Sequence, residues 1–167
     1  MIDAAIVGLG WWGRYIVSSL QGESNRIRFV RAIDTNPDTA RDFSEENGLR
    51  FSSDFGDALN DDTVDAIILA TPHSLHGEQI VRAAAAGKHV FSEKPLALKK
   101  AGAVRAVAAC EQAGVVLGVG HERRFEPALL EIKTLFDRGD LGTIMHVEAN
   151  FSHDGLAAVK AGDWRAS

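Results

Sequence analysis

A glycine-rich segment near the N-terminus has the residue types and spacing of a phosphate-binding loop. An apolar run, Ala4–Val7, leads directly into Gly8-Leu9-Gly10-Trp11-Trp12-Gly13. We expect Gly8 to let the chain turn sharply, Gly10 to let bare backbone approach a ligand, and Gly13 to let the next helix lie close to the strand. Because N–H groups and the helix dipole favour an anion at a helix N-terminus, the segment predicts binding of a dinucleotide pyrophosphate.

An acidic residue follows at the distance that this interpretation requires. Asp34 ends a second apolar run, Phe29–Ile33, twenty-one residues after Gly13. A carboxylate there can accept both ribose hydroxyls of NAD but would repel the 2′-phosphate of NADP, although Arg41 could reach back from the next helix. We therefore expect NAD, with NADP less favoured. An adenosyl ligand of the methyltransferase kind and a turn without any ligand stay open as alternatives.

Three further polar segments follow apolar runs of strand length. They are Thr71-Pro72-His73-Ser74-Leu75-His76, Ser92-Glu93-Lys94-Pro95 and His121-Glu122-Arg123-Arg124-Phe125. In a doubly wound sheet, the loops at the carboxyl ends of the strands form the ligand crevice. The expected cofactor contacts are therefore Gly8, Gly10, Trp11, Trp12, Gly13, Asp34, Thr71, Pro72, His73, His76, Glu93 and Lys94.

Lys94 is the candidate catalytic residue. Oxidation of an alcohol by hydride transfer needs a proton acceptor at the hydroxyl, and a positioned lysine can supply it. Glu93 could orient the lysine or meet the nicotinamide ribose, and Pro95 permits a cis peptide that would fix the direction of the lysine. The alternative is a solvated pair of charges, Glu93 and Lys94, at a strand end.

Other side chains carry weaker signals. His73 and His76 lie three residues apart, but no third ligand is near them in the sequence, so we expect no metal site. One histidine should contact the cofactor and the other should cap the helix or face solvent. Of Trp11 and Trp12, one should pack on a neighbouring helix and the other should flank the cofactor. His121 and Arg124 are candidate substrate contacts, against the alternatives of a core or surface histidine and a solvated arginine.

The elements that must position these residues alternate along the chain. Strands are expected at Ala4–Val7, Phe29–Ile33, Arg50–Ser52, Ala66–Ala70, His89–Phe91 and Val115–Val119, with helical periodicity in most of the segments between them. Such alternation indicates parallel strands joined by helical crossovers. The predicted fold is a doubly wound α/β domain, the Rossmann fold, over residues 1–122.

Residues 123–167 depart from this alternation. Apolar positions at helical spacing predict a linking helix over 126–138. Met145, Val147, Ala149 and Phe151 then alternate with polar residues, which predicts the strand Ile144–Ser152, the start of a second α+β domain. A lone strand exposes an unpaired edge, so one possibility is a homo-oligomer through residues 144–153. The alternatives are that residues 144–167 pack irregularly or belong to a longer protein.

Composition limits the remaining possibilities. With 167 residues, of which 46% are hydrophobic, the chain can bury one full core. A net charge of −5 and only two adjacent basic pairs argue against a nucleic-acid partner. The single cysteine, Cys110, excludes an internal disulfide and is interpreted as a core residue. No cationic leader or membrane-length apolar segment is present, so we expect no membrane partner and a cytoplasmic location.

The chain resembles a known family in five segments: the glycine segment, Ala-Thr-Pro-His-Ser-Leu-His, Glu-Lys-Pro, Arg-Arg-Phe-Glu-Pro and Gly162-Asp163-Trp164-Arg165. The family that it resembles is the glucose-fructose oxidoreductase and myo-inositol dehydrogenase (Gfo/Idh/MocA) family. The resemblance implies an NAD(P)-dependent oxidoreductase of a sugar, polyol or related hydroxy compound. It further implies that Lys94 relays the proton, that Trp164 and Arg165 join the substrate site, and that an open, largely antiparallel second domain shapes the pocket.

The resemblance stops short of a complete catalytic set. The family's aspartate and histidine motif and most of its second sheet lie outside the 167 residues. We therefore expect a truncated form whose intact parent is the enzyme. The alternative is a nucleotide-binding module without catalytic turnover.

Overall fold

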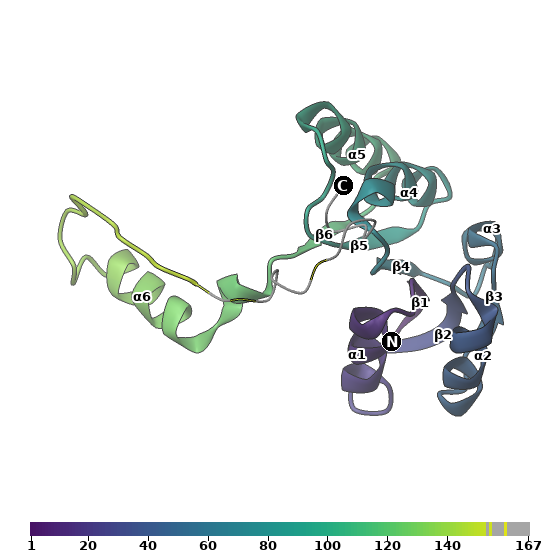
Figure 1. Cartoon of the computed structure of the whole chain (residues 1–167). Helices are drawn as coiled ribbons and strands as arrows, with labels where there is room; N and C mark the ends of the chain where they lie inside the picture. Colours follow the sequence, from purple (N-terminus) through teal and green to yellow (C-terminus); the bar gives the residue numbers. More distant parts are fainter. Residues whose placement is uncertain (153, 155–158, 160–167) are drawn as a thin grey trace. The chain divides into compact units, whose positions relative to one another are not determined.

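The computed structural model describes residues 1–152, 154 and 159. The chain folds into two compact units, Met1–Gly120 and His121–Ser167 (Figure 1). The first unit contains a six-stranded sheet in the order β3-β2-β1-β4-β5-β6, and every pair of neighbouring strands is parallel. The predicted doubly wound α/β fold is confirmed.

The elements of the first unit lie close to where the hydrophobic pattern predicts them. The strands are β1 (Ile2–Val7), β2 (Ile27–Ile33), β3 (Arg50–Ser52), β4 (Ala66–Leu69), β5 (His89–Glu93) and β6 (Leu117–Gly120). The helices are α1 (Trp11–Leu20), α2 (Pro37–Glu46), α3 (Phe55–Leu59), α4 (His73–Ala85) and α5 (Lys100–Ala113). The sequence analysis missed the short helix α3, which begins where the Asp54 side chain accepts a hydrogen bond from the backbone N–H of Gly56 at 2.7 Å.

Both faces of the sheet are buried, which is why the central strands consist of continuous apolar runs. Along β1, Ala4 and Ile6 join a core that includes residues of α1 and α2, whereas Ala5 and Val7 join a second core with α3, α4 and α5. Cys110 of α5 belongs to the second core and is 2% exposed, as predicted. Burial raises the pKa of its thiol.

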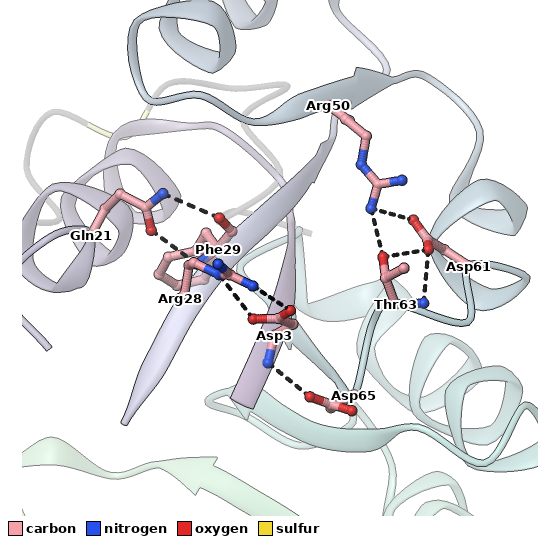
Figure 2. A network of polar contacts seen from close by, with 8 residues as sticks. All are labelled: Asp3, Gln21, Arg28, Phe29, Arg50, Asp61, Thr63 and Asp65. Atoms are coloured by element: carbon pink, nitrogen blue, oxygen red, sulfur yellow. Dashed lines mark hydrogen bonds and ion pairs between the residues drawn. The ribbon is translucent and has the colours of Figure 1, made fainter. Parts of the chain in front are cut away.

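A polar network joins the amino-terminal ends of the strands (Figure 2). Arg28 of β2 donates to the carboxylate of Asp3 in β1, with an Nη2–Oδ2 distance of 2.6 Å. Asp61, in the loop before β4, accepts from the Thr63 hydroxyl at 2.6 Å and pairs with Arg50 of β3 at 2.7 Å. The first contact joins two neighbouring strands, and the second joins β3 to the loop before β4, at the same edge of the sheet. The opposite edge, where the strands end, carries the candidate site.

The second unit contains η1 (Glu122–Phe125) and α6 (Pro127–Asp137), which lies where the linking helix is predicted. Arg123 pairs with Glu126 at 2.7 Å, and its guanidinium lies 4.2 Å from the ring centre of Phe151. The domain boundary expected after residue 122 lies two residues beyond the end of the first unit. That residues 123–167 begin a substrate domain stays a prediction.

The predicted strand Ile144–Ser152 is wrong, because these residues form neither helix nor strand. Alternating apolar residues favour an extended chain, but a strand also needs a hydrogen-bonded neighbour, and the described residues provide none for this segment. Met145 is 88% exposed and Val147 is 76% exposed. Association through residues 144–153 stays a prediction, and residue 153 lies outside the described residues. In the described part of the chain, no helix has the length and apolar character to cross a membrane.

Candidate cofactor site

The ends of five strands meet at one edge of the sheet. Val7 of β1 is paired with Ile33 of β2 and with Leu69 of β4, so the loops after these three strands begin side by side. At the other end of this row, Glu93 of β5 is paired with Gly120 of β6. Parallel pairing therefore brings the glycine segment, Asp34, Thr71 and Glu93 to the same edge, as predicted for a ligand crevice.

Two of the three glycines are required by the fold itself. Gly8 has a φ of +94°, and a Cβ added there would lie 2.7 Å from the carbonyl oxygen of Ala70. A Cβ on Gly13 would lie 1.9 Å from the carbonyl oxygen of Gly8, so the helix could not approach the strand. These are the turn and the close packing that the sequence predicts for Gly8 and Gly13.

Gly10 differs, because the protein leaves open space beside it. Its φ is −67°, which any residue can adopt, and an added Cβ would meet no atom within 4 Å. Neither conformation nor packing therefore calls for glycine here. Gly10 also precedes α1, whose first turn has no acidic residue and no side-chain cap. Bare backbone beside an uncapped helix N-terminus fits a pyrophosphate.

Asp34 holds the glycine segment to the end of β2. Its Oδ2 atom accepts the backbone N–H of Leu9 at 2.6 Å, and its Oδ1 atom accepts the N–H of Asn36 at 2.8 Å. The carboxylate is half-buried, and each oxygen retains acceptor capacity beyond these bonds. It can therefore still accept ribose hydroxyls from a nucleotide at this edge.

The two arginines on the helices beside Asp34 are held by other groups. The guanidinium of Arg41 lies 5.4 Å from the ring centre of Phe51 in β3. Arg14 lies 5.0 Å from the ring centre of Phe43, and it donates to the carbonyl oxygens of Leu9 and Thr39. The predicted possibility that Arg41 reaches back towards Asp34 is therefore not the arrangement in this structure.

Trp12 and Glu93 connect the glycine segment to the end of β5. The indole Nε1–H of Trp12 donates to Oε1 of Glu93 at 2.6 Å, and Oε2 of Glu93 accepts the backbone N–H of Lys94 at 3.2 Å. On the side of β6, a Cβ on Gly120 would lie 2.7 Å from Glu93 Oε1, so the carboxylate rests against bare backbone. Sequence reasoning missed this contact. Buried indole N–H groups usually find an acceptor, but the sequence does not show which acceptor lies nearby.

The two tryptophans of the loop form an aromatic stack with Tyr15. The ring centres of Trp12 and Tyr15 are 5.1 Å apart, and those of Trp11 and Tyr15 are 5.9 Å apart. Trp11 is 76% exposed, whereas Trp12 is half-buried. Trp12 thus packs on its own helix and reaches across to β5 rather than packing on a neighbouring helix.

The loops after β4 and β5 carry the remaining candidates. The Lys94 side chain is exposed beside the site, and the Lys94–Pro95 peptide is cis. Thr71 donates its hydroxyl to the Gln79 side chain at 2.6 Å, and Pro72 and His73 begin α4 at the same edge. These positions are compatible with the cofactor contacts expected of Thr71, Pro72, His73 and Lys94, which stay predictions.

His76 lies behind this edge rather than on it. Its ring is 1% exposed, and its Nδ1 and Nε2 atoms are each 2.8 Å from a backbone carbonyl oxygen, those of Pro95 and Thr71. Because both ring nitrogens are used inside the protein, neither is left for a cofactor or a metal. The expected direct contact of His76 with the cofactor is replaced by a contact with the two loops.

The candidate substrate residues belong to the second part of the chain. His121 and Arg124 are exposed in the second unit. Trp164 and Arg165 lie outside the described residues. The substrate contacts predicted for all four stay predictions.

Comparison with known proteins gives independent findings on this chain. A family model described as an oxidoreductase family with an NAD-binding Rossmann fold matches residues 2–121. The scyllo-inositol 2-dehydrogenase (NAD(+)) of Bacillus subtilis is 34% identical over 142 residues, which are 84% of this chain and 42% of that protein.

Solved structures show the same similarity. The WlbA dehydrogenase from Bordetella pertussis, in complex with NADH and UDP-GlcNAcA, matches 84% of this chain and 43% of its own with a TM-score of 0.79 and 34% identity. An oxidoreductase from Desulfitobacterium hafniense, described as NADPH-dependent, matches 99% of this chain and 48% of its own with a TM-score of 0.90 and 26% identity. This chain spans less than half of the length of each of these three proteins.

Proposed function

This chain belongs to the Gfo/Idh/MocA oxidoreductase family with its NAD-binding Rossmann fold, and on that premise we propose that it binds NAD for hydride transfer to or from a hydroxy compound. The substrate class is a sugar, a polyol or a related alcohol, since the relatives include a scyllo-inositol dehydrogenase. The observation that carries the proposal is the open space beside Gly10. The fold does not require glycine at this position, whereas a bound pyrophosphate requires a residue without a side chain there.

The residues at the carboxyl edge divide the work of such a reaction. A bound nicotinamide ring supplies a carbon that accepts or donates hydride. Lys94 takes the proton of the substrate hydroxyl when the alcohol is oxidised and returns it in the reverse direction. Glu93, held by the Trp12 indole, meets the nicotinamide ribose, and Asp34 accepts the hydroxyls of the adenosine ribose.

Gly10→Ala tests the proposal directly. Because the new methyl group meets only open space, the unfolding free energy should fall by no more than about 1 kcal/mol, the usual cost of alanine at a helix N-cap. The dissociation constant for NADH should rise about tenfold or more through collision with the pyrophosphate. NADH fluorescence titration measures this. Gly77→Ala is the matched control, since its Cβ makes an ordinary 3.5 Å contact in α4, and it should bind NADH normally. Unchanged NADH affinity in Gly10→Ala would reject the pyrophosphate site.

We further propose that NAD is preferred over NADP. The Asp34 carboxylate would repel a 2′-phosphate, and Arg14 and Arg41 are held on aromatic rings. Asp34→Asn keeps an acceptor at the position but removes the charge, so the ratio of the NADP to the NAD dissociation constant should fall about tenfold. Calorimetric titration with both cofactors measures the ratio. A preference for NADP in the unmodified chain would contradict this assignment.

A second candidate function is cofactor binding without turnover. It is favoured by the exposure of the candidate substrate residues His121 and Arg124 in this chain. The purified chain should then bind NADH but reduce no NAD with a panel of polyols. Reproducible turnover that Lys94→Ala abolishes would reject this second candidate and support the role of Lys94.

A further inference from the structure

We propose that His76 is a positioning residue that carries a proton on both ring nitrogens and, in that form, ties the loop after β4 to the loop after β5. The tie itself rests on the geometry of the chain. Its consequence for nicotinamide binding rests on the proposed function.

The two hydrogen-bond partners of the ring determine its protonation. Nδ1 lies 2.8 Å from the carbonyl oxygen of Pro95, and Nε2 lies 2.8 Å from the carbonyl oxygen of Thr71. A carbonyl oxygen only accepts hydrogen bonds, whereas a neutral imidazole has a single N–H to donate. In a neutral ring one nitrogen lone pair would face an oxygen lone pair at hydrogen-bonding distance. Both contacts are favourable only for the imidazolium form, in which both nitrogens donate.

Burial makes this requirement strict. His76 is 1% exposed, so water cannot replace either partner. Burying a charge costs free energy, and the two carbonyl acceptors of the ring offset part of that cost with charge-assisted hydrogen bonds. Charge-assisted bonds of this kind are also stronger than neutral ones, which suits a contact between two loops.

The position of His76 in the chain allows the ring to reach both loops. It lies in the first turns of α4, shortly after Thr71, and Pro95 follows the end of the neighbouring strand β5. The ring therefore sets the distance between the backbone at Thr71 and the backbone next to Lys94. The ring nitrogens of His76 contact only the backbone of Thr71 and of Pro95, so the effect of His76 on the reaction passes through the positions of Thr71 and Lys94.

Nuclear magnetic resonance of the full 167-residue chain, labelled with ¹⁵N in histidine, tests the protonation. At neutral pH, His76 should show two protonated ring nitrogens, and its signals are identified by their loss in His76→Gln. His89 provides an internal reference, because its Nδ1 atom accepts a hydrogen bond from the backbone N–H of Val116 at 3.1 Å. An unprotonated nitrogen in the His76 ring would overturn the proposal.

The positioning role is tested by the variants His76→Gln and, as control, His89→Gln, which changes an exposed histidine at the start of β5. The first should shift the backbone amide signals of Thr71 and Lys94 and raise the dissociation constant for NADH about tenfold, the worth of one charge-assisted hydrogen bond. The second should do neither. Unchanged amide signals and NADH affinity in His76→Gln would overturn the positioning role. If the unmodified chain binds no NADH, the proposed function fails. The signals of the His76 ring nitrogens and of the backbone amides still show whether His76 connects the two loops.

Discussion

At the scale of single residues, aspartates at the two edges of the sheet differ in how fully they are bound. Asp34, at the carboxyl edge, accepts two backbone N–H groups and retains lone pairs for a ligand. Asp61, at the amino edge, has a side chain that is only 7% exposed, and its partners are Thr63, Arg31 and Arg50. Burial raises the pKa of Asp61, but the hydrogen bonds from Thr63 and Arg31 and the charge of Arg50 outweigh it and lower the pKa to about 2.

Asp61→Asn should therefore destabilise the protein in a pH-dependent way. A carboxyl whose pKa is lowered by folding stabilises the native state above its ordinary pKa of 3.8, and that contribution is lost as the pH falls towards about 2. We expect the variant to lose about 1–2 kcal/mol of unfolding free energy at neutral pH and little at pH 2. Urea unfolding across this range measures the difference. Asp62→Asn, an exposed neighbour, should show no such loss, and a deficit in Asp61→Asn that persists unchanged at pH 2 would contradict this assignment.

At the scale of elements, one side chain joins α1 to β5 across the carboxyl edge. Trp12 sits in the first turn of α1, and its indole donates to a carboxylate that also contacts the loop containing Lys94. Helix α1 and β5 are not neighbours in sequence. The Trp12–Glu93 hydrogen bond therefore couples the packing of the glycine segment to the position of the Glu93 side chain. Disturbing the indole should affect both stability and cofactor binding.

Trp12→Phe removes the N–H donor and keeps an aromatic ring for the stack with Tyr15. The unfolding free energy should fall by about 1.5–3 kcal/mol, the usual worth of a hydrogen bond to a charged group. NADH affinity should fall as well, because Glu93 loses its orientation. Trp11→Phe is the matched control for stability, since the Trp11 ring is 76% exposed, and it should leave the unfolding free energy unchanged. Equal losses of stability in the two variants would refute the role of the Trp12–Glu93 bond.

At the scale of the whole molecule, the apolar cores formed by the described residues lie within the first unit. Among these residues, both buried clusters and the partly buried side chains that pack on them come from positions before Gly120. The second unit instead exposes apolar side chains along α6, among them Leu129, Ile132 and Phe136. The free energy of folding should therefore come almost entirely from residues 1–120.

A chain ending at Gly120 should accordingly fold cooperatively, with the same urea midpoint as the 167-residue chain, and should bind NADH with the same dissociation constant. Circular dichroism and NADH fluorescence measure the two quantities, with the 167-residue chain as reference. A lower midpoint for the shorter chain would show that residues 121–167 contribute to the stability of the first unit.

The sequence by itself determined the order of strands and helices. It also determined that the candidate site residues lie at the carboxyl ends of the strands. Period and run length are local properties, so the apolar runs, the glycine spacing and Asp34 identify a doubly wound sheet and its ligand edge without a structure. The short helix α3 was not predicted, because five residues show little periodicity. The strand Ile144–Ser152 was predicted wrongly, because alternation of apolar and polar residues does not reveal whether a pairing strand exists.

Only the tertiary structure decided which side chains meet at that edge. The Trp12–Glu93 bond joins residues 81 positions apart, and the ring of His76 meets carbonyl oxygens on two separate loops. Likewise, Gly8, Gly10 and Gly13 look alike in sequence, yet two satisfy the backbone and one leaves room for a ligand. Such distinctions depend on atoms brought together by folding from distant parts of the chain, and no local pattern encodes them.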